Sequence, residues 1–238
     1  MSIHLERITV RAEKFPTEKH YPFTLPVFRQ MPPLPVDASV MCFVGENGSG
    51  KSTLLEAVAR ACGIHIWQAE GGTRYQGNPV ENLLYRYVQV KWADGPVAGS
   101  FFGSDIFRDF AKLVDAWAAA DPGQLKYYGG KSLLTQSHGE SLMSYFRNRC
   151  RIKGLYLLDE PETALSPKSQ LELLTILSAN GESGNAQFIL ATHSPILLAC
   201  PKARIYSFDT VPVRSIAYEE TDHYRIYKEF LEDRNKYL

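Results

Sequence analysis

The sequence predicts an α/β protein with a mostly parallel β-sheet that is flanked by helices. Short apolar runs typical of buried strands lie at 40–44, 154–161 and 187–195. Segments with helical apolar spacing alternate with them, at 51–62 and 167–179. A glycine-rich turn joins the first of these strands directly to the first helix. Since parallel strands need crossover helices, this alternation predicts a sheet that is covered on both faces.

The rest of the chain predicts further elements of both kinds. Residues 15–37 hold six of the 14 prolines and are expected to form loop or edge structure, because proline lacks the amide that a central strand needs. Residues 63–82, rich in glycine and polar side chains, are expected to form a loop. Additional strands are predicted at 3–10, 83–92 and 203–208, and additional helices at 104–119, 138–150 and 222–234.

Length, charge balance, cysteine spacing and apolar runs limit the classes of protein to which the chain can belong. With 238 residues, we expect a single domain over 1–238. Lys plus Arg and Asp plus Glu both number 26, so net charge gives no support for binding nucleic acid or an anionic membrane. The four cysteines form no CxxC pair, the first residues do not resemble a signal peptide, and no apolar run is long enough to cross a membrane. We therefore expect a soluble, cytoplasmic protein without direct membrane insertion.

The segment GENGSGKST carries the strongest chemical signal, because it fits the pattern GxxxxGK[ST] between a predicted strand and a predicted helix. Its glycines let the backbone aim several N–H groups at a phosphate, and the helix adds its positive dipole end. The lysine can reach the terminal phosphates and the serine can offer its hydroxyl to Mg²⁺. The predicted phosphate-binding residues are Gly45, Glu46, Asn47, Gly48, Ser49, Gly50, Lys51, Ser52 and Thr53.

Two acids follow the apolar run of LYLLDEPE and form a second signal. Asp159 and Glu160 are expected at the carboxyl end of a buried strand, where open α/β sheets bind ligands. Adjacent residues of an extended segment point in different directions, so the two acids can have different roles. We expect Asp159 to serve Mg²⁺ and Glu160 to orient or deprotonate the water that attacks the terminal phosphate.

A third signal is ATHSP, at the end of the next apolar run, which places His193 at the same edge of the sheet. There it can contact the terminal phosphate or position the water. A lone histidine at a strand end is more often an ordinary surface or packing residue, so the context supports this assignment rather than the residue itself.

These motifs, in their order along the chain, resemble those of the ABC-class ATPases over residues 45–195. QSHGES, residues 136–141, stands where that class has its LSGGQ signature, and Ser137 precedes Asp159 by 22 residues. SHGE and DEPETALSP are more similar to the stand-alone, non-transporter branch, with the relatives of SMC and RecF that are often labelled AAA family ATPases. The resemblance implies a P-loop NTPase fold with a small helical subdomain, here about 93–150, that carries the signature.

The resemblance also implies a mechanism in trans. In this class two domains pack head to tail, and each ATP lies between the P-loop of one and the signature of the other. Ser137 and Gly139 would then act on the nucleotide of the partner. The residues themselves support an anion site, because a serine followed by helix amides can bind phosphate. The alternative is that Ser137 is an ordinary N-cap, and SHGES is at most a weak capping box.

Two expected parts of the site have more than one candidate. Members of the class have a glutamine on the metal side of the site, between P-loop and signature. Gln89 is the preferred candidate, although it lies inside a predicted strand. Asp105, in GSFFGSD, is the alternative. An aromatic residue before the P-loop often stacks on adenine. The candidates are Phe15, Tyr21, Phe23 and Phe28.

The resulting functional prediction is Mg²⁺-dependent hydrolysis of ATP to ADP and phosphate by an ATP-driven homodimer that acts on an unknown partner. The segment between P-loop and signature has no sustained heptads, which excludes a coiled-coil arm. Alternatives are the ATP-binding subunit of an ABC transporter and a DNA repair or defence ATPase.

Overall fold

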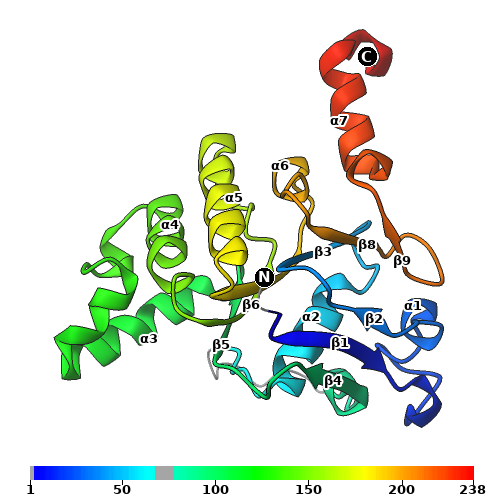
Figure 1. Cartoon of the computed structure of the whole chain (residues 1–238), viewed down its shortest axis with the longest axis horizontal. Coiled ribbons are helices and arrows are strands. Elements are labelled where there is room, and N and C mark those ends of the chain that lie inside the picture. Colours follow the sequence, from blue (N-terminus) through cyan, green and yellow to red (C-terminus); the bar gives the residue numbers. More distant parts are fainter. Residues whose placement is uncertain (1–2, 68–77) are drawn as a thin grey trace.

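The computed structural model describes residues 3–67 and 78–238, so residues 68–77 of the loop predicted at 63–82 lie outside the described residues. Its main sheet has six strands in the order β5-β6-β7-β3-β8-β9 (Figure 1). The first five are mutually parallel and β9 pairs antiparallel with β8. Their bounds are Gly99–Gly103 (β5), Gly154–Asp159 (β6), Ala186–Ala191 (β7), Val40–Val44 (β3), Arg204–Ser207 (β8) and Arg214–Ile216 (β9).

A second, antiparallel sheet has the order β2-β1-β4. Its strands are Leu34–Pro35 (β2), Leu5–Val10 (β1) and Val88–Trp92 (β4). The short β2, which ends in a proline, forms one edge, as expected for a strand that cannot complete its ladder. This sheet lies on the side of helix α2, Lys51–Ala61, away from the main sheet (Figure 1).

Alternation along the central strand explains this layering. Met41 and Phe43 of β3 share a buried core with Leu54 and Val58 of α2 and with the antiparallel sheet. The intervening residues, including Cys42, point to the opposite face and belong to a second core. A strand buried on both faces therefore holds the P-loop between two packed layers.

Helices cover the second face of the main sheet (Figure 1). Phe107 and Phe110 of α3 are buried together with Tyr145 and Phe146 of α4 and with Phe102 of β5. The aromatic residues of this region thus form core packing. The helices of this layer are α3 (Phe107–Ala120), α4 (His138–Arg149), α5 (Pro167–Glu182) and α6 (Pro195–Leu198).

The predicted α/β class, with a mostly parallel sheet flanked by helices, is confirmed, but strand β5 was not predicted. Glycines where β5 and its neighbour β6 begin permit close packing. A Cβ at Gly99 would lie 2.3 Å from Ile64 Cδ1, and one at Gly154 would lie 2.5 Å from the Ala98 carbonyl oxygen. The strand predicted at 83–92 is also shorter than expected, because residues 84–87 form a 3₁₀ turn before β4.

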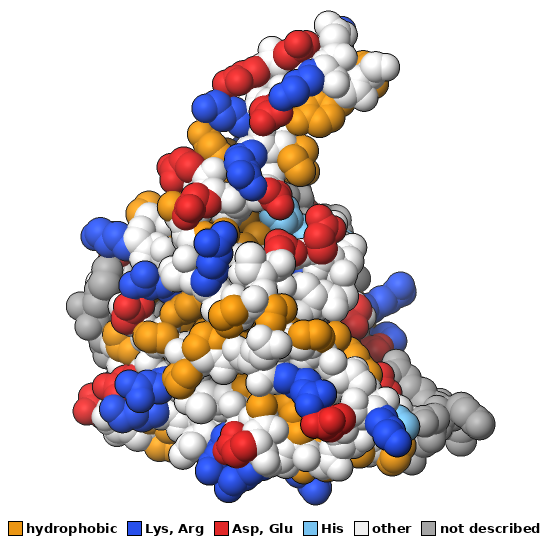
Figure 2. Space-filling model, turned by 90° about the vertical axis from the view of Figure 1, so that its right-hand side faces the viewer, with side chains coloured by type: hydrophobic (Ala, Val, Ile, Leu, Met, Phe, Trp, Pro, Cys, Tyr) orange, Lys and Arg blue, Asp and Glu red, His pale blue; other side chains and the backbone are white. Residues whose placement is uncertain are grey.

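The C-terminal helix α7, Asp222–Glu232, projects from the body (Figure 1), and Figure 2 shows the projection carrying charges of both signs. Leu231 is 79% exposed near its end. In the parts of the chain that the structure describes, no helix is long and apolar enough to cross a membrane.

The remaining short elements are α1 (Pro26–Arg29) and 3₁₀ turns at Ala12–Lys14, Leu84–Tyr87, Pro122–Tyr128, Leu133–Thr135, Tyr218–Glu220 and Arg234–Tyr237.

Candidate functional site

The P-loop follows β3 and requires glycine at positions of special backbone geometry. Gly48 and Gly50 have φ angles of +79° and +101°, in the left-handed region that favours glycine. At Gly50 a Cβ would also lie 2.9 Å from the ring of Phe28. The loop therefore turns tightly and delivers the chain to Lys51, where α2 begins.

Lys51 lies inside this loop, with only 4% of the residue exposed. Its Nζ donates hydrogen bonds to the carbonyl oxygens of Gly45 at 2.6 Å and Glu46 at 2.8 Å. Burial lowers the pKa of Lys51, while the nearby carboxylates of Asp209, Glu160 and Asp159 act in the opposite direction. The cation is held within the concave loop, where a phosphate group would be neutralised.

Ser52 and Asp159 bring the end of β6 to the start of α2. The Ser52 hydroxyl donates a hydrogen bond of 2.8 Å to Asp159 Oδ1. Burial raises the pKa of Asp159 to about 7, and the Ser52 hydrogen bond opposes the rise. A hydroxyl beside a carboxylate is a set of hard oxygen donors, which fits Mg²⁺ held by a few protein ligands together with phosphate and water.

Glu160 directly follows Asp159 and has φ +44°, a left-handed conformation that is uncommon for a residue with a side chain. Its backbone N–H donates to the Ala191 carbonyl oxygen at 2.9 Å, which ties the turn to the end of β7. The side chain is 40% exposed, and its Oε1 lies 3.8 Å from Nε2 of His193. The structure thus brings Glu160 and His193 together at one edge of the sheet.

Two residues that the sequence did not indicate hold His193. Glu162 is partly buried, and its Oε1 accepts a hydrogen bond of 2.6 Å from the backbone N–H of His193. His223 at the start of α7 has its Nε2 3.0 Å from His193 Nδ1. Glu162 could have been found from the sequence, because it is the second glutamate of the DEPE motif and lies two residues after Glu160. No local pattern pointed to His223.

Gln89 and Asp105, the two candidates for the metal-side residue, lie at different sheets. Gln89 lies inside β4 of the antiparallel sheet, opposite Thr9, with an exposed side chain. Asp105 follows β5 of the main sheet and lines a cavity of about 250 Å³ together with Ser52 and Glu56. Because the strands of the parallel sheet end at the ligand-binding edge, Asp105 lies on the side of Ser52, whereas Gln89 lies in the other sheet.

The signature segment begins α4, and the expectation of a weak capping box was wrong. Glu140 lies three residues after Ser137, as the motif requires, and both reciprocal bonds form. The Glu140 carboxylate accepts from the Ser137 backbone N–H at 3.1 Å and from its hydroxyl at 2.6 Å. Ser137 is thus an exposed N-cap, while a Cβ at Gly139 would lie 3.2 Å from the Ala164 carbonyl oxygen.

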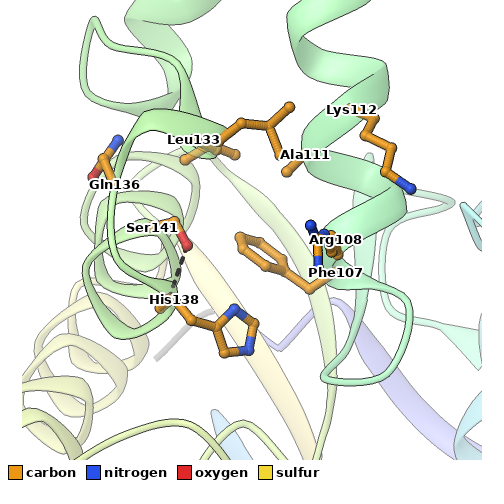
Figure 3. A pocket seen from close by; sticks show the side chains of 9 residues that line it. Phe107, Arg108, Ala111, Lys112, Leu133, Gln136, His138 and Ser141 are labelled. Atoms are coloured by element: carbon orange, nitrogen blue, oxygen red, sulfur yellow. Dashed lines mark hydrogen bonds between the residues drawn. The ribbon is translucent and has the colours of Figure 1, made fainter.

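Behind this helix start lies a cavity of about 580 Å³ between α3 and α4. Figure 3 shows Phe107 of α3 pointing toward Ser141 and His138 of α4, with the Ser141 hydroxyl bonded to the His138 carbonyl oxygen. Ser137 does not line this cavity. The signature serine therefore lies on the outer surface of the helical layer.

Of the four aromatic candidates for adenine stacking, Phe23 and Phe28 are fully buried. Phe15 packs edge-to-face on Phe23. Tyr21 is 41% exposed, and its hydroxyl contacts the hydroxyl of Thr53 in the P-loop. Tyr21 alone of the four combines exposure with a P-loop contact.

Comparisons with known proteins agree with this arrangement. A family model described as "AAA domain, putative AbiEii toxin, Type IV TA system" matches residues 131–199. The hemin import ATP-binding protein HmuV of Streptomyces coelicolor is 26% identical over 182 residues, covering 70% of this chain and 63% of that protein. The energy-coupling factor transporter ATP-binding protein EcfA1 of Thermotoga maritima is 27% identical, covering 63% of this chain and 60% of its own length.

The chain thus spans about three fifths of these curated relatives. A solved metal-chelate type ABC transporter in an inward-facing conformation has a similar fold, with a TM-score of 0.52 at 15% identity, covering 94% of this chain and 88% of that one. Together with the ordered motifs, these findings support an ABC-class P-loop ATPase.

Proposed function

We propose that the chain binds ATP with Mg²⁺ and hydrolyses it to ADP and phosphate. The observation that carries the proposal is the meeting of three strand ends at one edge of the main sheet. β3 leads into the P-loop, β6 ends at Asp159, which bonds to Ser52, and His193 follows β7 within 3.8 Å of Glu160. Phosphate-binding, metal-binding and water-activating groups converge there.

The roles follow from the chemistry of each group. Backbone amides of residues 45–53 and the Lys51 ammonium bind the phosphates. Ser52 and Asp159 would hold Mg²⁺, which supplies charge neutralisation at the phosphate oxygens when it is bound. Glu160, exposed at the mouth of the site, accepts the proton of the attacking water, and His193 contacts the terminal phosphate. Tyr21 is the proposed adenine platform.

The signature is proposed to act in trans, with Ser137 and Gly139 on the nucleotide of a second copy. Ser137 is exposed, and within the described residues it forms no hydrogen bond to the P-loop of its own chain. The Glu140 carboxylate bonds to Ser137 at this helix start, so a phosphate from a partner would replace it as the anion at the Ser137 hydroxyl and the helix amides. The chain would be a single ABC-type domain over 1–238, with a signature-bearing subdomain at about 93–150, acting in the cytoplasm as an ATP-driven homodimer switch of the non-transporter branch.

A second candidate function is that of an ATP-binding subunit in a transporter. The names of both curated relatives place them in transport, which favours this reading. A role in DNA repair or defence has weaker support, because the balanced charge offers no global attraction for nucleic acid. The three functions share the same ATP chemistry and differ in the partner.

The test is ATP hydrolysis by Glu160→Gln compared with wild type and with the control Glu182→Gln, an exposed position on α5 that pairs with Lys202. We expect Glu160→Gln to bind ATP and to lose about 100-fold or more in turnover, because general-base catalysis contributes about 10² to 10⁴. The control should hydrolyse ATP like wild type. Normal turnover in Glu160→Gln would contradict the assignment of the base.

A further inference from the structure

The contact between His193 and His223 joins the candidate site to the C-terminal helix. His193 Nδ1 and His223 Nε2 are 3.0 Å apart, and the ring planes are inclined by 51°. The outer nitrogens of the pair, His193 Nε2 and His223 Nδ1, are buried without a hydrogen-bond partner within the described part of the chain. The pair therefore presents one unpaired ring nitrogen, His193 Nε2, 3.8 Å from Glu160 Oε1 in the candidate site.

A hydrogen bond between two imidazole nitrogens needs one N–H and one lone pair, which leaves two arrangements for neutral rings. If His223 Nε2 donates, His193 carries its proton on Nε2. If His193 Nδ1 donates, its Nε2 is a bare lone pair. Burial lowers the pKa of both histidines, which disfavours the charged imidazolium form, in which both nitrogens of a ring carry a proton.

The surroundings favour the first arrangement. The atom that faces His193 Nε2 is a carboxylate oxygen of Glu160, which attracts an N–H and repels a lone pair. An oxygen of a terminal phosphate is also an acceptor, so it too would need an N–H at His193 Nε2. His193 Nε2 should therefore be a donor. By donating to His193 Nδ1, His223 can fix the His193 proton on Nε2.

The start of α7 is held in a fixed place, as a positioning residue requires. Thr221 is 1% exposed; its hydroxyl caps the helix by accepting from the Tyr224 N–H at 3.2 Å and donates to the Tyr218 carbonyl oxygen at 2.7 Å. The Tyr218 hydroxyl donates to the Pro195 carbonyl oxygen at 3.0 Å, two residues after His193. His223 is thus tied to the same segment as the histidine that it contacts.

We propose that His223 is a positioning residue that donates its Nε2 proton to His193 Nδ1 and thereby keeps His193 in the tautomer that offers an Nε2–H to the terminal phosphate of ATP. This inference rests on the proposed function, in which His193 contacts that phosphate. Through His223, helix α7 then contributes to the site, although none of the sequence motifs lies in this helix.

The experiment compares His223→Met and His223→Gln in the full chain. Methionine fills a similar volume but cannot donate, whereas the glutamine amide can replace the Nε2 donor. We expect His223→Met to reduce kcat about tenfold or more with little change in the KM for ATP, because a donor to the reacting oxygen is lost. His223→Gln should restore most of the rate. Ile226→Ala, at a 53% exposed position of the same helix, is the control for a general disturbance of α7.

The tautomer is measured directly by ¹⁵N NMR of the histidine rings in the nucleotide-free chain, with the His193 signals assigned from a His193→Gln sample. We expect the Nε2–H tautomer in wild type and a mixture of tautomers in His223→Met. An Nδ1–H tautomer in wild type, or equal kcat in wild type and His223→Met, would overturn the proposal. If wild type does not hydrolyse ATP, the proposed function fails, while the NMR result still decides the tautomer.

Discussion

Gln187 in β7 forms a buried junction between the two sheets, and its replacement by methionine gives a sharp test of the fold. The side chain is fully buried. Its Oε1 accepts from the backbone N–H groups of His4 at 3.0 Å and Leu5 at 2.7 Å. Its Nε2 donates to the carbonyl oxygens of Leu5 at 3.1 Å and Ala38 at 3.3 Å. One amide thus links β7, β1 and the residues that lead into β3.

The magnitude follows from the groups that methionine leaves without partners. Each buried polar group that loses its hydrogen bond costs about 1–3 kcal/mol. The N–H groups of His4 and Leu5 and the carbonyl oxygens of Leu5 and Ala38 all lose this partner, and the better transfer of methionine into the interior offsets part of the loss. We expect the free energy of unfolding to fall by about 2–4 kcal/mol, a large part of the ~5–15 kcal/mol typical of a domain.

The assay is urea unfolding followed by circular dichroism, where this loss should lower the midpoint by about 1 M. The control is Gln89→Met, the same substitution at an exposed strand position, which should change the free energy of unfolding by less than about 0.5 kcal/mol. Equal midpoints for Gln187→Met and Gln89→Met would show that this buried amide does not stabilise the contact between the sheets.

Three further predictions concern the site. Lys51→Ala should abolish measurable ATP binding in calorimetry, because the buried cation of the P-loop is lost; unchanged affinity would contradict the phosphate site. Asp105→Ala should lower Mg²⁺-dependent turnover by about tenfold or more, whereas Gln89→Met should retain it, and the reverse order would restore Gln89 as the metal-side residue. Tyr21→Ala should weaken ATP binding by about 1–2 kcal/mol, and Tyr21→Phe should bind nearly as wild type; equal loss in both would indicate that the hydroxyl, not the ring, matters.

The parts of the molecule that the sequence predicted well are those with local causes. The P-loop lies between a strand and a helix that are adjacent in the chain, so its glycines, Lys51 and Ser52 could be placed from spacing alone. The same holds for Asp159, which ends an apolar strand. Here the local pattern and the fold agree, and the parallel sheet followed from the alternation of strands and helices.

Features that depend on distant segments were not predictable in the same way. His223 reaches His193 across 30 residues, and Gln187 bonds His4 across 183 residues, through a fold that no local pattern specifies. The strand β5 was not predicted, and its Gly99 is required by close packing against Ile64 and the backbone of Leu155, which lie in other segments of the chain. The capping box of α4, by contrast, was readable, since Ser137 and Glu140 have the required spacing.

In the proposed mechanism, ATP joins two copies of the chain through the P-loop of one and the signature of the other. The mass of Glu160→Gln in solution, measured by light scattering with and without Mg-ATP, shows whether this happens. We expect a monomer without nucleotide, a dimer with Mg-ATP, and no dimer when Ser137→Arg is added. A protein that binds Mg-ATP and remains a monomer would contradict the homodimer mechanism.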